Sequence, residues 1–151
     1  FFKCFCIKNY MVVLDYPDKI DKITVGCILV YNGKFLLFHR ADNSCWNSIA
    51  GNVDEEDPVE AIRRELKEEI GLELAPEFFT TTYHDYAGET VEYNLFAYVF
   101  DEDPSDSIVL DPVHSEFKLF SLEEALKLKL FEDEDYCLKL YAESFREDEE
   151  F

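Results

Sequence analysis

The chain has 151 residues, which is the size of one domain. Its composition is 48% hydrophobic and 16% aromatic with only five Gly and five Pro, which excludes collagen-like, low-complexity and wholly disordered chains. Lys plus Arg number 14 and Asp plus Glu number 34, so the net charge is −20, and a surface this negative argues against nucleic acid or an anionic membrane as the partner.

We therefore expect a single domain over residues 1–151, with residues 1–10 set apart as an N-terminal extension and residues 146–151 as a solvated acidic tail. No stretch approaches the roughly 20 apolar residues that a membrane span needs. The five cysteines are odd in number and include no Cys-x-x-Cys pair. This pattern predicts no disulfide framework and hence a reducing compartment, the cytoplasm.

The first part of the chain predicts strands. Residues 11–14 form one short candidate. The apolar runs 23–30 and 35–38 flank Asn32-Gly33, which is typical of a β-hairpin with a tight turn. Residues 42–50 are rich in Asn and Ser and are expected to form a loop.

A helix over Pro58–Ile70 has the clearest boundaries in the sequence. Asp57 is placed to cap its N-terminus, Pro58 suits the first helical position, and Glu60 completes a capping-box pattern. Gly71 follows where a left-handed residue ends a helix.

The second half of the chain predicts further strands and then helices. Residues 87–89 supply a turn signal, and residues 121–124 repeat the capping-box pattern. The expected elements are strands at 78–84, 91–100 and 117–120, a helix from 121 to about 130, and an amphipathic helix at 133–145 with Tyr136, Leu140 and Tyr141 on one side. This order indicates a mixed α/β sandwich.

Three carboxylates share one side of the helix at 58–70. At about 100° per residue, Glu65, Glu68 and Glu69 fall within an arc of about 100°. The arc borders an apolar stripe of Val59, Ile62, Leu66 and Ile70.

Such crowding is unfavourable by itself, because like charges three and four residues apart repel and the helix dipole disfavours acids near the C-terminus. A divalent cation such as Mg²⁺ or Mn²⁺ would reverse the sign of these effects. A solvated acidic face is the alternative interpretation.

Residues 51–56 and 64–72 resemble the Nudix box, G-x5-E-x7-R-E-U-x-E-E-x-G-U, where U is aliphatic. Arg64 to Leu72 match every fixed position of its second half, and residues 46–51 are similar to the segment that precedes the box. The resemblance implies a Nudix-like α/β/α sandwich with a mixed β-sheet.

The sequence departs from that pattern at three places. Four residues separate Gly51 from Glu56 where the box has five, and Ala50 replaces the first Gly of a usual pair. Val113 stands where many members of the family carry a further Glu. Two nearby acids are the possible replacements as an extra metal ligand or base: Glu116 and Asp111.

The resemblance implies a role for each matching residue. Glu65 or Glu69 would polarise the attacking water, and Arg64 would hold the carboxylates in place through forked ion pairs. The implied metal ligands are Glu65, Glu68, Glu69, Glu56 and the backbone carbonyl of Ala50.

Other residues are candidates for contacting the substrate, each with a structural alternative. Arg40 would meet phosphate or form a surface salt bridge, and Trp46 would stack on a base or cover the core. Tyr83, with His84 and Tyr86, would line the pocket or pack within its strand. The histidines His39 and His114 are interpreted as structural or surface residues.

The function implied by the resemblance is Mg²⁺-dependent hydrolysis of a nucleoside diphosphate linked to a group X. The preferred substrate is a small nucleoside or deoxynucleoside triphosphate, cut to monophosphate and pyrophosphate; dinucleoside polyphosphates, nucleotide sugars and capped RNA stay open. One alternative is a catalytically weak nucleotide-binding or sensing module, and another is an acidic interaction domain. The sequence leaves the oligomeric state open, with a homodimer as one possible state.

Overall fold

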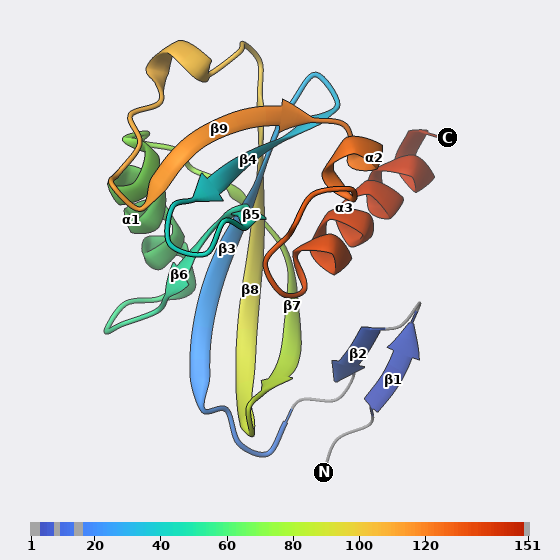
Figure 1. The fold of residues 1–151 in the computed structure, drawn as a ribbon. Helices are drawn as coiled ribbons and strands as arrows, with labels where there is room; N and C mark the ends of the chain where they lie inside the picture. Colours follow the sequence, from blue (N-terminus) through green and yellow to red (C-terminus); the bar gives the residue numbers. More distant parts are fainter. Residues whose placement is uncertain (1–3, 8–9, 14–16, 150–151) are drawn as a thin grey trace.

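The computed structural model describes the backbone of residues 4–7, 10–13 and 17–149 and the side chains of residues 17–144. A seven-stranded mixed sheet lies at its centre (Figure 1). Its main path runs β5-β4-β3-β8-β7, with β6 paired to β3 and β9 paired to β4. The strands are β3 (Lys22–Tyr31), β4 (Lys34–Arg40), β5 (Trp46–Asn47), β6 (Ile49–Asn52), β7 (Glu77–Tyr86), β8 (Glu89–Phe100) and β9 (His114–Phe120).

The central pair of this sheet, β3 and β8, is parallel, and the other pairs are antiparallel. The predicted mixed sheet is therefore confirmed. Two further strands, β1 (Cys4–Ile7) and β2 (Tyr10–Val13), form a separate antiparallel sheet. Residue 14, part of the strand predicted at 11–14, lies outside the described residues.

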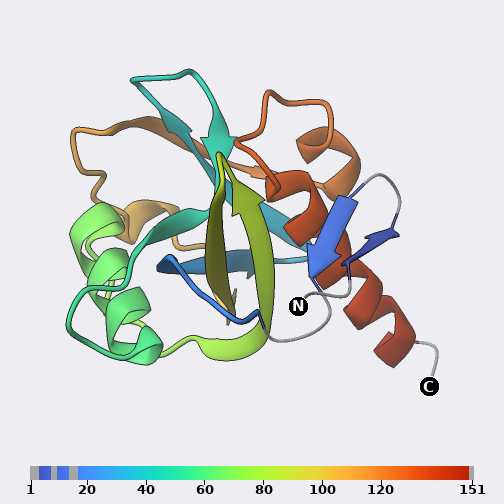
Figure 2. The same cartoon turned by 90° about the horizontal axis from the view of Figure 1, so that it is seen from below.

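Helices α1 (Pro58–Ile70) and α3 (Glu134–Glu149) cover opposite faces of the sheet, as Figure 2 shows from below. Side chains of β3 alternate between these faces. Val25, Cys27 and Leu29 join the core under α1, whereas Ile28 and Val30 join the core under α3. The two helices with the sheet between them form the expected α/β/α sandwich. No helix in the described part of the chain is long and apolar enough to span a membrane.

Helix α1 has the predicted boundaries. The Asp57 side chain accepts a hydrogen bond from the backbone N–H of Glu60 at 2.9 Å, and Gly71 takes φ 74° at the C-terminus. The apolar stripe differs at one position, because Val59 is 50% exposed and Ala61 is buried instead. The prediction for Val59 was therefore wrong.

Two tight turns join the hairpin strands. Asn32 and Gly33 have φ 51° and 73°, and Ala87 and Gly88 have φ 50° and 84°. Successive positive φ values are typical of type I′ turns, whose twist matches that of paired strands. Both predicted hairpins are confirmed.

The segments with weak local signals differ from expectation. The predicted loop at 42–50 contains β5 and the start of β6, because their backbones pair with β4 and β3. Helix α2 (Leu122–Ala125) has the predicted capping box but ends well before residue 130, and Leu130 instead bridges to Trp46. Helix α3 runs beyond residue 145 and includes residues 146–149, which the sequence placed in an acidic tail.

Candidate functional site

Arg64, on the exposed side of α1, joins the helix to the segment that precedes it. Its Nε and Nη2 donate to Glu56 at 3.0 and 2.6 Å, and Nη2 also donates to the carbonyl oxygen of Asn52 at 3.0 Å. Its Nη1 donates to Glu65 at 3.0 Å. The guanidinium holds the pKa of Glu56 below its usual range. This is the geometry expected of a side chain that orients carboxylates.

Glu65 lies against the backbone of β6. A Cβ atom on Gly51 would come within 2.2 Å of the Glu65 Cδ atom, so only glycine leaves room for this carboxylate. The Glu65 side chain is 13% exposed, and burial raises its pKa. The close contact between α1 and β6 at this site therefore depends on Gly51.

Glu69 has the environment in this group that most disfavours an ionised carboxylate. Its side chain is 12% exposed, and its Oε2 atom is buried with no hydrogen-bond partner among the described residues. Burial, followed by the proximity of Glu65 and Asp111, raises the pKa of Glu69 to about 8. An arrangement of this kind is unfavourable unless a cation neutralises it.

Asp111, in the loop before β9, and His114, the first residue of β9, complete this cluster. The Asp111 Oδ1 atom lies 2.8 Å from His114 Nδ1, and His114 Nε2 lies 3.9 Å from Glu69 Oε1. One ligand atom each from Glu69, Asp111 and His114 lies within 4.8 Å of the other two. The backbone N–H of Asp111 donates to the carbonyl oxygen of Glu69 at 3.1 Å, which fixes the loop to the end of α1.

These residues fit a hard divalent cation. Carboxylate oxygens are the ligands preferred by Mg²⁺ and Mn²⁺, and the unpartnered Glu69 oxygen is an acceptor without a donor. Of the two acids considered as replacements near Val113, Asp111 joins this cluster. Glu116 is exposed, with its carboxylate 4.0 Å from Lys118. His114 was interpreted as structural, because a lone histidine carries no spacing signal.

Glu68, the third carboxylate of the predicted arc, points outward. Its side chain is 58% exposed and its Oε2 atom lies 3.4 Å from Arg64 Nη1. The structure thus brings Glu65 and Glu69 together at the rim of the core and leaves Glu68 on the surface, where its predicted role as a ligand stays a prediction.

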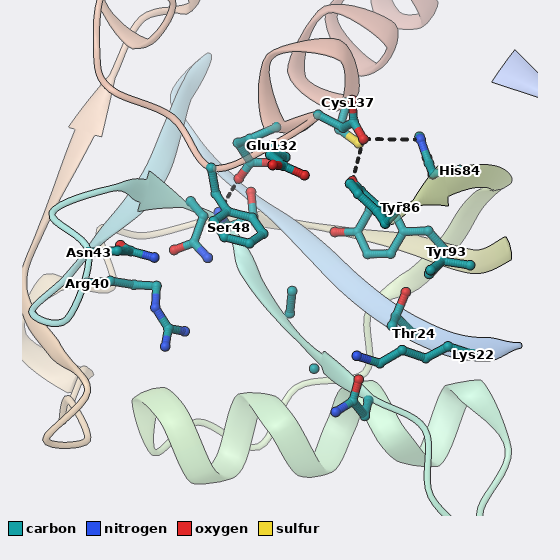
Figure 3. A pocket seen from close by; sticks show the side chains of 18 of the residues that line it. Lys22, Thr24, Arg40, Asn43, Ser48, His84, Tyr86, Tyr93, Glu132 and Cys137 are labelled. Atoms are coloured by element: carbon teal, nitrogen blue, oxygen red, sulfur yellow. Dashed lines mark hydrogen bonds and ion pairs between the residues drawn. The ribbon is translucent and has the colours of Figure 1, made fainter. Parts of the chain in front are cut away.

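A cavity of about 640 Å³ (Figure 3) opens beside β6, and Glu65, Glu69 and Asp111 are not among the described residues that line it. Ala50 and Gly51 of β6 form part of its wall, next to Glu65. Arg40 and Asn43 lie on one side in Figure 3, and Lys22 and Thr24 lie on the other. A volume of this size suits a small-molecule ligand.

Arg40 forms the surface salt bridge that was one of its two interpretations from the sequence. Its Nε and Nη2 donate to Asp42 at 3.0 and 2.8 Å, which is a surface salt bridge. The same guanidinium borders the cavity and is attracted to Glu69 and Asp111. It is therefore placed beside the carboxylate cluster, and phosphate contact stays a prediction.

The aromatic candidates divide between the cavity and the core. His84 and Tyr86 line the cavity, whereas Trp46 and Tyr83 are not among the described residues that line it. The Trp46 ring packs edge-on against Phe120, with centroids 5.0 Å apart. Tyr83 Oη lies 3.5 Å from Glu92.

Sequence reasoning missed several polar residues of the cavity wall, among them Asn47, Ser48 and Glu134. They come from the β5–β6 segment and the start of α3, which meet only in the folded chain. A sequence signal existed only for the first two, in the polar stretch around Trp46.

Known proteins are similar to this chain in sequence and in fold. A family model described as NUDIX domain matches residues 21–141. The chain is 32% identical over 82 residues to Phosphatase NudJ of Escherichia coli K12, covering 52% of this chain and 54% of that protein. The chain thus spans about half the length of the curated relatives it matches.

Two solved structures share the fold. One is the NUDIX domain of Shewanella oneidensis NrtR complexed with ADP ribose, with TM-score 0.72 and 18% identity over 87% of this chain and 94% of that chain. The other is a C. elegans Ap4A hydrolase binary complex, with TM-score 0.64 and 22% identity over 83% of this chain and 98% of that chain. These identities indicate a shared fold.

Proposed function

The chain belongs to the NUDIX domain family, and on this premise we propose that it is a Mg²⁺-dependent hydrolase of a nucleoside diphosphate linked to a group X. The observation that carries the proposal is the group of partly buried carboxylates, Glu65, Glu69 and Asp111, in which one Glu69 oxygen has no hydrogen-bond partner among the described residues. Mn²⁺ is the alternative ion.

The residues divide the chemistry among them. Glu65, Glu69 and Asp111 would hold the metal, which when bound neutralises diphosphate charge and lowers the pKa of water. Glu65 or Glu69 accepts the proton of the attacking water, and Arg64 keeps Glu65 in position. The oxygen of water bonds to one phosphorus while the anhydride P–O bond breaks, leaving two phosphorylated products.

We assign a small nucleotide as the substrate, preferably a nucleoside or deoxynucleoside triphosphate cut to monophosphate and pyrophosphate. The net charge of −20 disfavours long RNA, because its backbone would be repelled. Arg40 beside the carboxylates supports a phosphate group at the cavity wall. The ADP ribose and Ap4A named for the two solved structures are nucleotides that contain a diphosphate, and they support the same class here.

A reducing cytoplasmic setting is part of the proposal. Cys27, Cys45 and Cys137 are buried free thiols, as expected where disulfides do not form.

The rival function is a nucleotide-binding module with weak catalysis. Ala50 and Val113 favour this rival, since both depart from the usual pattern of the family. Asp111 argues against the rival, because its carboxylate joins the cluster and can replace the Glu that many members of the family carry at the position of Val113.

The deciding experiment incubates the protein with Mg²⁺ and a panel of nucleoside triphosphates, dinucleoside polyphosphates and nucleotide sugars, and identifies both products. We expect turnover, with a rate about 10²-fold lower in Glu65→Gln. Asp111→Asn should lose activity and Glu116→Gln should keep it. Nucleotide binding without turnover on any member of the panel would favour the rival.

A further inference from the structure

Two buried side-chain oxygens lie in the cavity wall. Ser48 is 3% exposed, and neither its Oγ atom nor the Oδ1 atom of Asn47 meets the geometry of a hydrogen bond with a described residue. Buried polar atoms are almost always hydrogen-bonded, so each orphan needs an explanation. Both residues line the cavity.

A buried carboxylate stands next to these two residues. Glu134, at the start of α3, is buried and its Oε1 atom accepts the backbone N–H of Ser48. Burial raises the pKa of Glu134, and the nearby Ser48 side chain opposes that shift. Glu132 and Asp133 line the same end of the cavity. This end therefore presents mainly hydrogen-bond acceptors.

Aromatic rings flank the acceptors. Figure 3 shows Tyr86 and His84 on the side of the cavity toward Cys137. Their rings are nearly parallel, with an interplanar angle of 29° and centroids 6.0 Å apart. Asp133 accepts a hydrogen bond from the Tyr86 hydroxyl and lies 3.3 Å from His84 Nδ1, which fixes both rings. Flat apolar faces beside edge-directed polar atoms are suited to a heteroaromatic ring.

We propose that this end of the cavity binds the substrate's base and selects an amino group beside an unprotonated ring nitrogen, the edge shared by adenine and cytosine. Asn47 Oδ1 and the Glu134 carboxylate accept from the amino group, and the Ser48 hydroxyl donates to the ring nitrogen. In a base with an oxo group at this position, the carbonyl oxygen would face the acceptor oxygens of Asn47 and Glu134, and binding would be weaker because acceptors repel one another. The inference rests on the proposed function for the choice of a nucleotide.

The test measures binding without catalysis. AMP is titrated against IMP, and CMP against UMP, in EDTA, with dissociation constants taken from NMR shift changes. Each pair differs at the amino or oxo position, so phosphate contributions cancel. We expect AMP and CMP to bind about tenfold more tightly than their oxo partners, equivalent to about 1.4 kcal/mol.

Two variants locate the preference. Glu134→Gln keeps an oxygen for the Ser48 N–H but adds a donor, so the preference should fall to threefold or less, or reverse. Ser48→Ala removes only the hydroxyl and should reduce the preference as well. Glu89→Gln removes the same charge from an exposed residue of the cavity wall and should leave the preference unchanged. Thermal melting shows that each variant is folded.

Equal binding within a pair, a preference for the oxo partner, or no binding of any monophosphate would overturn the inference. So would a preference that survives in both Glu134→Gln and Ser48→Ala. Failure of the proposed function appears separately, as absence of Mg²⁺-dependent hydrolysis while the amino preference persists.

Discussion

Glu69 is the residue at which function and folding stability oppose each other. Its carboxylate is buried beside Glu65 and Asp111, and one oxygen lacks a partner in the described structure. Without a cation, the ionised form is destabilised by lost hydration and by repulsion. The fold keeps a costly side chain there, as expected of a metal ligand.

We therefore expect Glu69→Gln to raise the free energy of unfolding in EDTA by about 1 kcal/mol, because it removes one close repulsion. The pKa of Glu69 is raised to about 8 from an ordinary value of 4.5, so its cost is absent below pH 4.5, where the acid is protonated in both states. The stabilisation by Glu69→Gln should therefore increase as the pH rises from 4.5 to 8. Urea unfolding across that range measures it.

Magnesium should act in the opposite direction. Adding Mg²⁺ should raise the melting temperature of the natural protein and change that of Glu69→Gln much less. Glu68→Gln, at an exposed position, is the matched control for stability in EDTA and should melt like the natural protein. Equal stability of Glu69→Gln and the natural protein in EDTA would mean that the Glu69 carboxylate does not destabilise the fold.

At the scale of elements, the two hairpin turns offer a direct comparison. Both place two successive residues at positive φ, but the first turn uses Asn32-Gly33 and the second uses Ala87-Gly88. In both residues the Cβ atom crowds the following carbonyl, but the short polar side chain of Asn can hydrogen-bond locally, so Asn tolerates the left-handed region better than Ala. The β7–β8 turn therefore carries strain that the β3–β4 turn avoids.

Ala87→Asn should stabilise the protein by about 0.5–1 kcal/mol, and Asn32→Ala should destabilise it by a similar amount. Chemical denaturation of both variants measures the difference. Neither turn touches the carboxylate cluster, so Mg²⁺ affinity should stay constant in both. A loss of stability in Ala87→Asn would show that the second turn is not strained.

Elements with local signals were predictable, and those made by tertiary pairing were not. Helix α1 has its cap at Asp57 and its left-handed end at Gly71, so its boundaries follow from nearby residues. Strand β5 has two residues and forms by pairing with β4, so its local sequence does not predict it. Helix α2 ends at Ala125, and Leu130, which was predicted to lie in this helix, pairs with Trp46 instead.

The site divides in the same way. Glu65, Glu69 and Arg64 lie in one motif on one helix, and the sequence predicts that they lie close together. The partnership of Asp111 and His114 with Glu69 depends on a loop folding back onto the end of α1, through the backbone bond from Asp111 to Glu69. No spacing along the chain encodes that contact.

At the scale of the molecule, the net charge of −20 surrounds a site proposed to receive an anion. Long-range repulsion slows the approach of nucleotides, and salt screens it over about 10 Å at 0.1 M. Basic phosphate-binding proteins show the reverse dependence.

We therefore expect the association rate of a nucleoside triphosphate, at saturating Mg²⁺, to rise with NaCl between low and physiological ionic strength. Stopped-flow measurement with a fluorescent nucleotide tests this. An uncharged sugar polymer at matched osmolality is the control for the salt itself. A rate that falls steeply with NaCl would indicate that Arg40 and Lys22 dominate the field at the cavity.

The segment from Asn47 to Asn52 carries the oxygens proposed to read the base and, three residues later, the glycine that admits Glu65. Six consecutive residues thus set the spacing between the end of a ligand that is recognised and the end that is cut. Lengthening this segment by one residue would change the distance between the base-binding residues and Glu65. Relatives that differ in length here should therefore differ in which bond of a shared ligand they present to water.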